Sequence, residues 1–253
     1  MMKNSNKDSK RSVKKSFKKR LVKIAASFLI VISAVIVGFY IYTLDYYRAS
    51  EEVLQITENT SLEVVLDDNI TTIYPEDSKK TSTGLIFYPG GKVEASAYLP
   101  LLIQLAEEGI TCILIEMPMN LAVFDVNAAD DIFDDYPEIQ QWYIAGHSLG
   151  GAMASSYMKD NYDKVSGMIL LGAYPVNDAP VETLVLYGTY DVMLDLEKVG
   201  LADKVVEIKD GNHANFGNYG TQKGDGVALI TREEQQKIAV DAILAFIDST
   251  QPQ

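Results

Sequence analysis

Residues 146–151 read Gly-His-Ser-Leu-Gly-Gly, and this stretch decides the fold. It follows the apolar run Trp-Tyr-Ile-Ala at residues 142–145 and precedes the small residues 152–156. A G-x-S-x-G pattern between a strand and a helix is typical of a nucleophile elbow, a sharp turn that strains the serine backbone and lifts its hydroxyl above the sheet. The glycines allow the helix to pack close to the strand. The pattern therefore predicts that Ser148 is a nucleophile, rather than part of a plain strand-to-helix turn.

Apolar runs and helical patterns alternate along the chain on both sides of this turn. Residues 62–66 and 70–74 predict a β-hairpin, because turn residues separate two β-branched runs. Further strands are predicted at 84–88, 110–117, 141–145, 165–171, 182–187 and 204–208, and helices at 97–108, 127–136 and after a capping box of Thr231 and Glu234. This alternation predicts a three-layer α/β fold, a mostly parallel sheet with helices on both faces. The connection at 172–181 is too short to hold a cap domain.

The first 44 residues differ sharply from the rest of the chain. Residues 1–23 contain ten Lys or Arg and one acid and therefore carry a charge of +9. Because the net charge of the whole chain is −13, the remaining residues carry −22. Residues 24–44 contain no charge, and as a helix they would span about 31 Å, the hydrocarbon thickness of a bilayer. We therefore predict a basic head at 1–23 and one transmembrane helix at 24–44 that binds the lipid bilayer.

The position of the basic head predicts the orientation of this span. Positive charge favours the cytoplasmic side, which places the N-terminus in the cytoplasm and residues 45–253 outside it, at the cell membrane. Four tyrosines cluster at the far end of the span, where aromatic rings favour the interface: Tyr40, Tyr42, Tyr46 and Tyr47. A cleaved signal peptide is the alternative, although its apolar region usually has about 7–15 residues. The acidic remainder of the chain argues against a nucleic-acid partner.

The remainder of the chain suits one globular unit of medium size. Residues 45–60 are predicted as a polar stalk and residues 61–253 as the catalytic domain. Cys112 is the only cysteine, so an intramolecular disulfide is impossible. It lies in an alternating-to-apolar run, which predicts a buried, inert thiol rather than a catalytic one.

His213 is the predicted base of the site. A serine hydroxyl is a weak nucleophile until a neighbouring base, most often a histidine, takes its proton. The chain has two histidines, and His147 precedes Ser148 in a tight turn where adjacent side chains point apart. His213 lies in a loop after the last predicted strand. That position places it at the carboxyl edge of the sheet, beside the serine.

Asp191 is the predicted acid. The imidazole needs a carboxylate on its far nitrogen, which fixes the tautomer and stabilises the imidazolium. Asp191 follows the strand at 182–187 and therefore also lies at a carboxyl edge. The chain order Ser148, Asp191, His213 is one of the known orders of such triads. Asp195 is the first substitute for Asp191.

Two backbone amides are predicted to bind the oxyanion that forms during acyl transfer. One is the N–H of Leu149, the residue after the nucleophile. The other comes from the turn Tyr-Pro-Gly-Gly-Lys at residues 88–92, where Gly91 is the first candidate and Lys92 the second. A Pro-Gly turn without a catalytic role is the alternative.

The four segments together resemble the α/β-hydrolase superfamily: Tyr88-Pro-Gly-Gly, Gly146-His-Ser-Leu-Gly-Gly, Gly188-Thr-Tyr-Asp191 and Gly211-Asn-His213. Within it, residues 80–250 resemble the compact, capless bacterial group related to dienelactone hydrolases and carboxylesterases. The resemblance implies an α/β-hydrolase fold and a serine hydrolase of esters or thioesters without metal or organic cofactor. Dienelactone hydrolases carry cysteine at the position of Ser148, so their specific reaction is not implied.

We therefore expect an acyl-enzyme on Ser148, formed from a small-molecule or surface-borne acyl ester. A membrane-anchored binding protein on an inactive fold, and a peptidase or lipase, are the alternatives. Residues 117–120 follow a strand and either line the substrate cleft or pack as ordinary loop residues. The Gly-rich segment 223–226 either borders the acyl pocket, holds a cation, or is a mobile turn.

Overall fold

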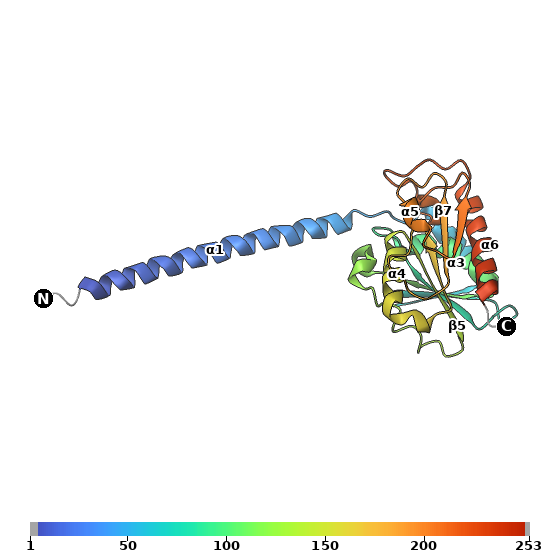
Figure 1. The fold of residues 1–253 in the computed structure, drawn as a ribbon, viewed down its shortest axis with the longest axis horizontal. Coiled ribbons are helices and arrows are strands. Elements are labelled where there is room, and N and C mark those ends of the chain that lie inside the picture. The colour runs from blue at the N-terminus through green and yellow to red at the C-terminus, as the bar shows by residue number, and fades with distance from the viewer. Residues whose placement is uncertain (1–4, 251–253) are drawn as a thin grey trace. The chain divides into compact units, whose positions relative to one another are not determined.

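The strand that leads into the Gly-His-Ser-Leu-Gly-Gly turn lies inside an eight-stranded sheet of order β1-β2-β4-β3-β5-β6-β7-β8. The strands are β1 (Glu63–Asp67), β2 (Ile70–Tyr74), β3 (Thr83–Tyr88), β4 (Thr111–Ile115), β5 (Gln141–His147), β6 (Gly167–Leu171), β7 (Thr183–Gly188) and β8 (Lys204–Ile208). β3 to β8 are parallel, whereas β1 and β2 form the predicted antiparallel hairpin and join the sheet antiparallel to β4. Figure 1 shows the twisted sheet inside its helices.

The computed structural model describes the backbone of residues 5–250 and the side chains of residues 20, 21 and 23–250. The α-helices are α1 (Ser5–Leu44), α2 (Glu51–Asn59), α3 (Leu99–Glu107), α4 (Leu149–Asn161), α5 (Leu196–Val199) and α6 (Arg232–Thr250). The 3-10 helices are η1 (Ala95–Tyr98), η2 (Pro118–Asn120), η3 (Ala122–Phe124), η4 (Tyr162–Lys164) and η5 (Ala214–Phe216). The predicted capping box is present at α6, where Thr231 and Glu234 each accept the other's backbone N–H.

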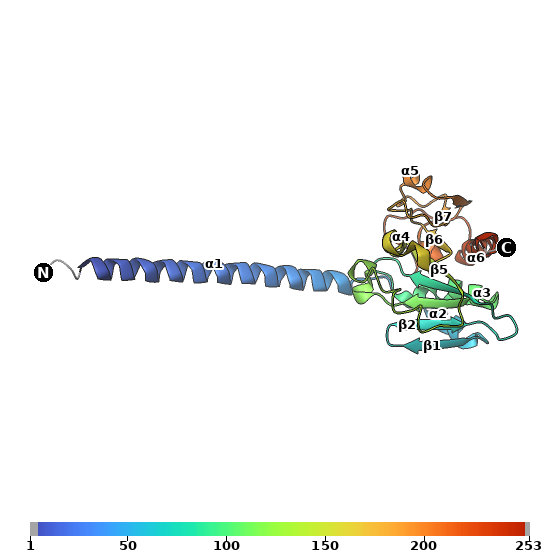
Figure 2. The ribbon, with the colours of Figure 1, turned by 60° about the horizontal axis from the view of Figure 1, so that its bottom comes forward.

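Helices cover both faces of the sheet because its strands are apolar on both sides. Leu85 and Phe87 of β3 pack in one buried cluster with residues of α3 and α6. The alternating residues Ile86 and Tyr88 pack in a second cluster with residues of α4. Figure 2 shows α4 on one side of the sheet and α3 and α6 on the other. The predicted three-layer α/β fold is confirmed, with only residues 172–182 connecting β6 to β7.

One predicted helix is absent. The acidic segment 127–136 forms hydrogen-bonded turns, in which backbone N–H groups bond to carbonyls three residues earlier. The hydroxyl of Tyr88, at the end of β3, donates to the carbonyl of Val126 and accepts the N–H of Ala129, both at 2.9 Å. The bond to Val126 occupies a carbonyl that would accept the N–H of Asp130 in a helix, and that N–H bonds to Asn127 instead. The prediction of a helix at 127–136 is therefore wrong.

The segment predicted as a polar stalk, residues 45–60, contains α2 and packs on the sheet-bearing unit. Val53 of α2 is buried in the cluster that contains α3. Tyr47 forms a parallel β-bridge with Val93. Cys112 is buried, as predicted, and burial raises the pKa of its thiol, so it stays protonated.

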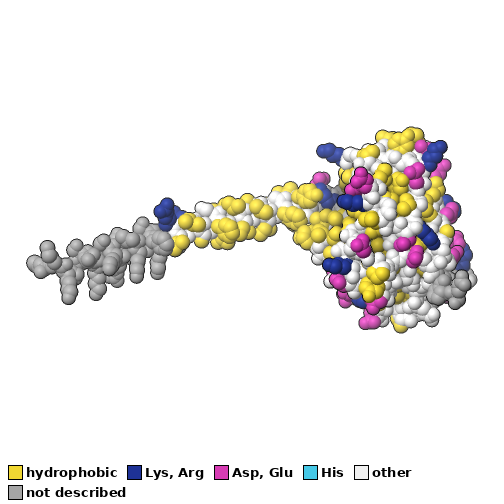
Figure 3. All heavy atoms as spheres, in the orientation of Figure 1, with side chains coloured by type: hydrophobic (Ala, Val, Ile, Leu, Met, Phe, Trp, Pro, Cys, Tyr) yellow, Lys and Arg dark blue, Asp and Glu magenta, His cyan; other side chains and the backbone are white. Residues whose placement is uncertain are grey.

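The chain divides into two compact units, Met1–Asp45 and Tyr46–Gln253. The first contains α1, whose stretch Lys23–Leu44 is long and apolar enough to cross a membrane. A signal sequence near an N-terminus meets the same criterion. In the view of Figure 3, hydrophobic side chains predominate along α1 beyond the basic side chains at the start of its described part, whereas Asp, Glu, Lys and Arg are distributed over the visible face of the second unit. Most of the predicted basic head, residues 1–23, lies outside the described side chains.

Candidate active site

Ser148 lies in the turn between β5 and α4 with a strained backbone. Its φ of 51° and ψ of −120° fall outside the regions that L-residues favour, at a cost of about 1–3 kcal/mol. The turn is held by a bond from the N–H of Ser148 to the carbonyl of Leu171 at 2.9 Å. Gly150 permits the close packing that the motif predicts, because a Cβ there would lie 2.1 Å from the carbonyl oxygen of Tyr88. The strain matches a nucleophile elbow.

His213 and Asp191 form a buried pair. Nδ1 of His213 lies 2.7 Å from Oδ2 of Asp191, and both side chains are almost fully buried. The other carboxylate oxygen of Asp191 accepts the N–H of Met193 at 3.0 Å. Nε2 of His213 is buried and has no hydrogen-bond partner among the described residues. A buried nitrogen without a partner needs an explanation, and a hydroxyl or substrate atom would satisfy it.

Gly172 places this pair beside the serine turn. It follows Leu171, whose carbonyl holds the N–H of Ser148. Its φ is +52°, and a Cβ there would lie 2.9 Å from Nδ1 of His213 and 3.1 Å from Oδ2 of Asp191. Only glycine suits this position, because a side chain would displace the His–Asp pair. Leu171 therefore bonds to the backbone of the predicted nucleophile, and the next residue, Gly172, lies against the predicted base and acid.

Asp195, the substitute acid, serves a different purpose. It is exposed, and its Oδ1 accepts the N–H of Glu197 at the start of α5. Its Oδ2 lies 3.2 Å from Nζ of Lys198. Between the two candidates, the structure places only Asp191 against His213.

Two amides of the turn at residues 88–92, those of Gly90 and Lys92, make structural hydrogen bonds. The N–H of Gly90 donates to the Tyr98 hydroxyl at 3.1 Å, and the N–H of Lys92 donates to the carbonyl of Asn120 at 2.7 Å. Lys92, the second candidate, therefore already uses its amide. Gly91 lies between them and packs on Leu149, since a Cβ on it would be 2.7 Å from Leu149 Cδ2. The two predicted oxyanion donors, Gly91 and Leu149, are thus neighbours.

His147 connects this turn to the base. Its Nδ1 lies 2.8 Å from the hydroxyl of Tyr98, and its Nε2 lies 3.1 Å from the carbonyl oxygen of His213. A carbonyl only accepts, so Nε2 carries a proton. Burial lowers the pKa of His147 well below its usual value, and nearby His213 lowers it further, so the ring is neutral and Nδ1 accepts.

Tyr98 completes the chain of bonds. Burial raises the pKa of its hydroxyl, which therefore keeps its proton and donates it to Nδ1 of His147. The same oxygen accepts the N–H of Gly90. The hydrogen bonds thus run in one direction, from the N–H of Gly90 to the Tyr98 hydroxyl, from that hydroxyl to Nδ1 of His147, and from Nε2–H of His147 to the carbonyl of His213. The bonds connect the candidate oxyanion turn to the loop of the candidate base.

Replacing Tyr98 by Phe should disturb both ends of this chain. The N–H of Gly90 and Nδ1 of His147 would lose their partner in a buried place, so we expect a loss of about 2 kcal/mol of unfolding free energy. We also expect kcat to fall about tenfold, a barrier increase near 1.4 kcal/mol. Urea unfolding and ester turnover measure the two effects.

Tyr143→Phe is the matched control for this substitution. Tyr143 is also fully buried, and its hydroxyl bonds to Thr250 and Ile247 at the end of α6. It should lose stability but keep its kcat. Equal kcat values for the two variants would show that the bonds of Tyr98 are only structural.

Two polar residues that hold the His213 loop escaped prediction from the sequence. Asp225 accepts the N–H groups of His213, Ala214 and Gly226 at 2.8–3.3 Å. Gln235, fully buried on α6, accepts the N–H of Asn212 and donates to its carbonyl. The segment 223–226 therefore supports the base loop through Asp225. A lone acid between glycines was the available signal, and Gln235 offered none.

A groove of about 580 Å³ lies on the hairpin side of the turn at residues 88–92. It is lined by residues of α2, β1, β2, η1 and their connections, including Leu62, Val64, Glu94 and Glu116. Asn120, which holds the N–H of Lys92, also lines it, whereas Met117 is buried in the core. The predicted nucleophile, acid and base do not line this groove. Among the described residues, no group of three or more His, Cys, Asp or Glu is placed to hold a metal ion.

Comparisons with known proteins show the family and the fold. A family model described as "Alpha/beta hydrolase family" matches residues 84–237. The fold is similar to Est1E from Butyrivibrio proteoclasticus (12% identity, TM-score 0.54, 76% of this chain and 99% of that one). It is also similar to naproxen esterase (carboxylesterase NP) from Bacillus subtilis, with 12% identity and a TM-score of 0.53 over 77% of this chain and 96% of that one. A third similar structure is carboxylesterase CesB from Bacillus subtilis, with 12% identity and a TM-score of 0.52 over 78% of this chain and 99% of that one. No curated protein matches the chain. At these identities the structural likeness concerns the fold.

Proposed function

The chain belongs to the alpha/beta hydrolase family, and on that premise we propose that it is a serine hydrolase that cleaves a carboxylic ester or thioester through an acyl-enzyme on Ser148. The observation that carries this proposal is the buried Nε2 of His213, which has no partner among the described residues while Nδ1 is bound to Asp191. This arrangement leaves one proton acceptor at the carboxyl edge of the sheet. The strained serine lies at the same edge.

The proposed reaction proceeds in two halves. Oγ of Ser148 attacks the carbonyl carbon as Nε2 of His213 takes its proton, and Asp191 holds Nδ1 and stabilises the imidazolium. The amides of Leu149 and Gly91 stabilise the oxyanion, where the loss of one donor costs about 3–4 kcal/mol. The tetrahedral intermediate releases the alcohol or thiol, which takes the proton from His213. A water molecule then attacks the acyl-enzyme by the reverse sequence and releases the acid.

The first test uses a fluorophosphonate probe on the full chain in detergent micelles. We expect covalent labelling of the wild type and none of Ser148→Ala. Ser96→Ala is the control, because Ser96 lies on η1 after the turn at 88–92 and is partly exposed. An unlabelled wild type, or equal labelling of the wild type and Ser148→Ala, would contradict the proposal. Turnover of p-nitrophenyl esters of increasing chain length then gives the acyl preference.

We also propose that α1 anchors the enzyme in the cell membrane, with the N-terminus in the cytoplasm and residues 45–253 outside it. The support is the uncharged stretch at 24–44 after a basic head, together with the candidate span Lys23–Leu44. Alkaline phosphatase fused after Gln253 should be active, and green fluorescent protein fused there should be dark after export. The reverse pattern would refute the orientation. Release of the chain from membranes by carbonate would refute the anchor.

A further inference from the structure

The chain enters the second unit beside the proposed oxyanion turn. The N–H of Tyr47 donates to the carbonyl of Lys92 at 2.8 Å, and the carbonyl of Tyr47 accepts the N–H of Glu94 at 2.9 Å. Lys92 directly follows Gly91. The entry point is therefore fixed by two backbone hydrogen bonds to the loop after β3, at the carboxyl edge of the sheet.

The loop of the proposed base also holds this entry. The hydroxyl of Tyr47 accepts the N–H of Lys223, and the N–H of Ser50 donates to the carbonyl of Asn218 at 2.8 Å. Both partners lie between His213 and α6, in the loop that contains Asp225. The entry segment thus contacts both loops that surround the candidate site. In the sequence, two residues, Asp45 and Tyr46, lie between Leu44, the last residue of the candidate span, and Tyr47.

Large apolar side chains are exposed on loops of this same edge. We call four of them the apolar rim: Met119 after β4, Val192 and Met193 after β7, and Val227 after β8. Their exposed fractions are 50, 69, 51 and 80%. A single exposed apolar residue is ordinary, but several around one site indicate a surface that contacts something apolar.

Direct contacts connect the loops of the rim that follow β7 and β8. Gln222 donates to Sδ of Met193 at 3.0 Å, and Gln222 precedes Lys223, the partner of Tyr47. A Cβ on Gly226 would lie 2.1 Å from the carbonyl oxygen of Tyr190, so the loop of Val227 packs on the loop of Val192. The rim is therefore continuous with the place where the chain enters.

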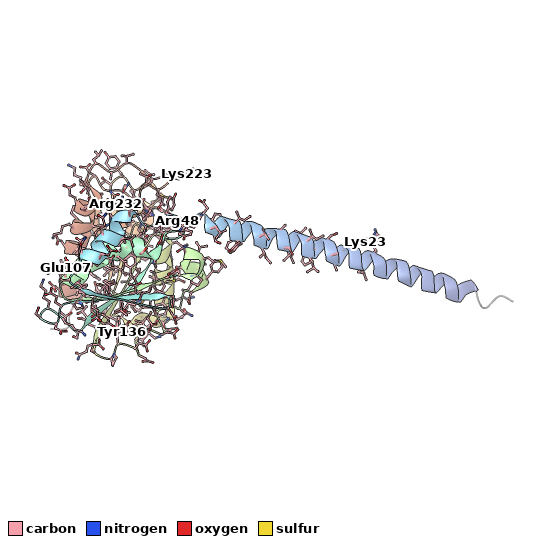
Figure 4. The ribbon with its side chains drawn as sticks, turned by 180° about the vertical axis from the view of Figure 1, so that it is seen from behind. Lys23, Arg48, Glu107, Tyr136, Lys223 and Arg232 are labelled. Atoms are coloured by element: carbon pink, nitrogen blue, oxygen red, sulfur yellow. The ribbon has the colours of Figure 1, made fainter. Side chains whose placement is uncertain are left out.

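The polar residues at the entry suit a lipid headgroup layer. The guanidinium of Arg48 lies 4.6 Å from the ring centre of Tyr46 and donates to its hydroxyl. Arg48 and Lys223 are both exposed, and Figure 4 shows them on neighbouring parts of the surface. Tyrosine and cations are typical of the membrane interface. The strongly acidic remainder of the chain disfavours a densely anionic surface, so a mainly zwitterionic bilayer is the fitting partner.

We infer that the apolar rim docks on the bilayer that holds residues 24–44, and that the substrate is the long-chain acyl ester of an amphiphile residing in that bilayer. The inference rests on the proposed function, both the nucleophile and the anchor. An ester carbonyl of such an amphiphile lies near the headgroup level, which a docked catalytic edge can reach. Hydrolysis would leave a fatty acid and an alcohol in the membrane.

Docking is tested first without any activity. Cys112 is buried, so a cysteine introduced by Val227→Cys takes a thiol-reactive fluorophore alone. In the full chain reconstituted in phosphatidylcholine vesicles, brominated lipid should quench this fluorophore at least threefold more than one at Leu201→Cys. Leu201 is similarly exposed (63%) but precedes β8, at the opposite edge of the sheet. Equal quenching would overturn the docking.

The substrate class is tested with two esters in the same vesicles. A fluorogenic long-chain acyl ester is embedded in the bilayer, and p-nitrophenyl butyrate is added in water. Val227→Asp should lower turnover of the embedded ester at least tenfold and leave the soluble ester unchanged, whereas Leu201→Asp, which adds the same charge, should change neither. Inserting twenty Gly and Ser residues between Leu44 and Asp45 should also lower only the embedded reaction.

The outcomes separate this inference from the proposed function. If the wild type cleaves the soluble ester but not the embedded one, or if Val227→Asp and Leu201→Asp behave alike, the inference fails while the hydrolase stands. If neither ester is cleaved and the probe does not label Ser148, the proposed function fails, and the substrate inference fails with it.

Discussion

Ser148→Ala, His213→Ala and the double substitution should all lower kcat to the same residual level, about a millionfold below the wild type. Each single change removes the whole act of nucleophilic attack, because the hydroxyl is inert without the base and the base has nothing to deprotonate without the hydroxyl. The second change therefore finds nothing left to remove. Steady-state turnover of p-nitrophenyl butyrate by the full chain in micelles measures all three.

The residual activity of these variants carries its own information. The amides of Leu149 and Gly91 remain in place, so the residual rate should still exceed that in water by about 10³–10⁴-fold. Additive losses in the double variant would contradict the coupling of Ser148 to His213. Thermal unfolding is the control, since Ser148→Ala should keep the fold.

Asp191→Asn should lower kcat about 10,000-fold. Oδ1 of Asp191 accepts the N–H of Met193, so an asparagine would keep its oxygen there and turn its NH₂ group towards Nδ1 of His213. An NH₂ group can only donate, which forces the proton of His213 onto Nε2. The ring would then present a proton to Ser148, where the reaction needs an acceptor.

Asp195→Asn is the matched control for this effect. It removes the same charge four residues away, from a side chain that caps α5. Its kcat should stay within about twofold of the wild type, and its stability should change little, because asparagine keeps the oxygen that accepts the N–H of Glu197 and caps a helix about as well as aspartate. Comparable losses of kcat in the two variants would contradict the assignment of Asp191. The unfolding midpoint of Asp191→Asn shows whether its loss of activity reflects a loss of fold.

Local pattern was sufficient for most of the fold. Apolar runs between glycines and polar turns located β3 to β7, because a strand buried on both faces must be apolar along its whole length. The turn at Ser148 was readable from its glycines, since a Cβ at Gly146, Gly150 or Gly151 would collide with neighbouring atoms in this tight strand-to-helix turn. His213 followed by elimination, because the chain has only one histidine outside the turn.

Interactions between segments that are distant in the sequence could not be predicted from local patterns of apolar and polar residues. The failed helix at 127–136 depends on the hydroxyl of Tyr88, which lies 38 residues before its partner Val126. The bonds of Asp225 and Gln235 to the base loop likewise depend on where two loops and α6 meet. His147 was set aside as the base from its place in the turn, whereas its bonds to Tyr98 and to the backbone of His213 required coordinates. Polar side chains that bond to remote backbone leave no periodic trace in a sequence.

The open sheet leaves two strands, β1 and β8, with one unpaired side each. Such edges can template pairing with another chain, and proteins oppose this by placing charge on them. Glu63 and Asp67 stand on β1, and Lys204 and Glu207 stand on β8, all exposed. A protein confined to a surface meets its own copies far more often than one free in solution. At the membrane surface that we propose for this chain, the charged edges of the sheet would oppose self-association through β-pairing, which otherwise grows with surface density.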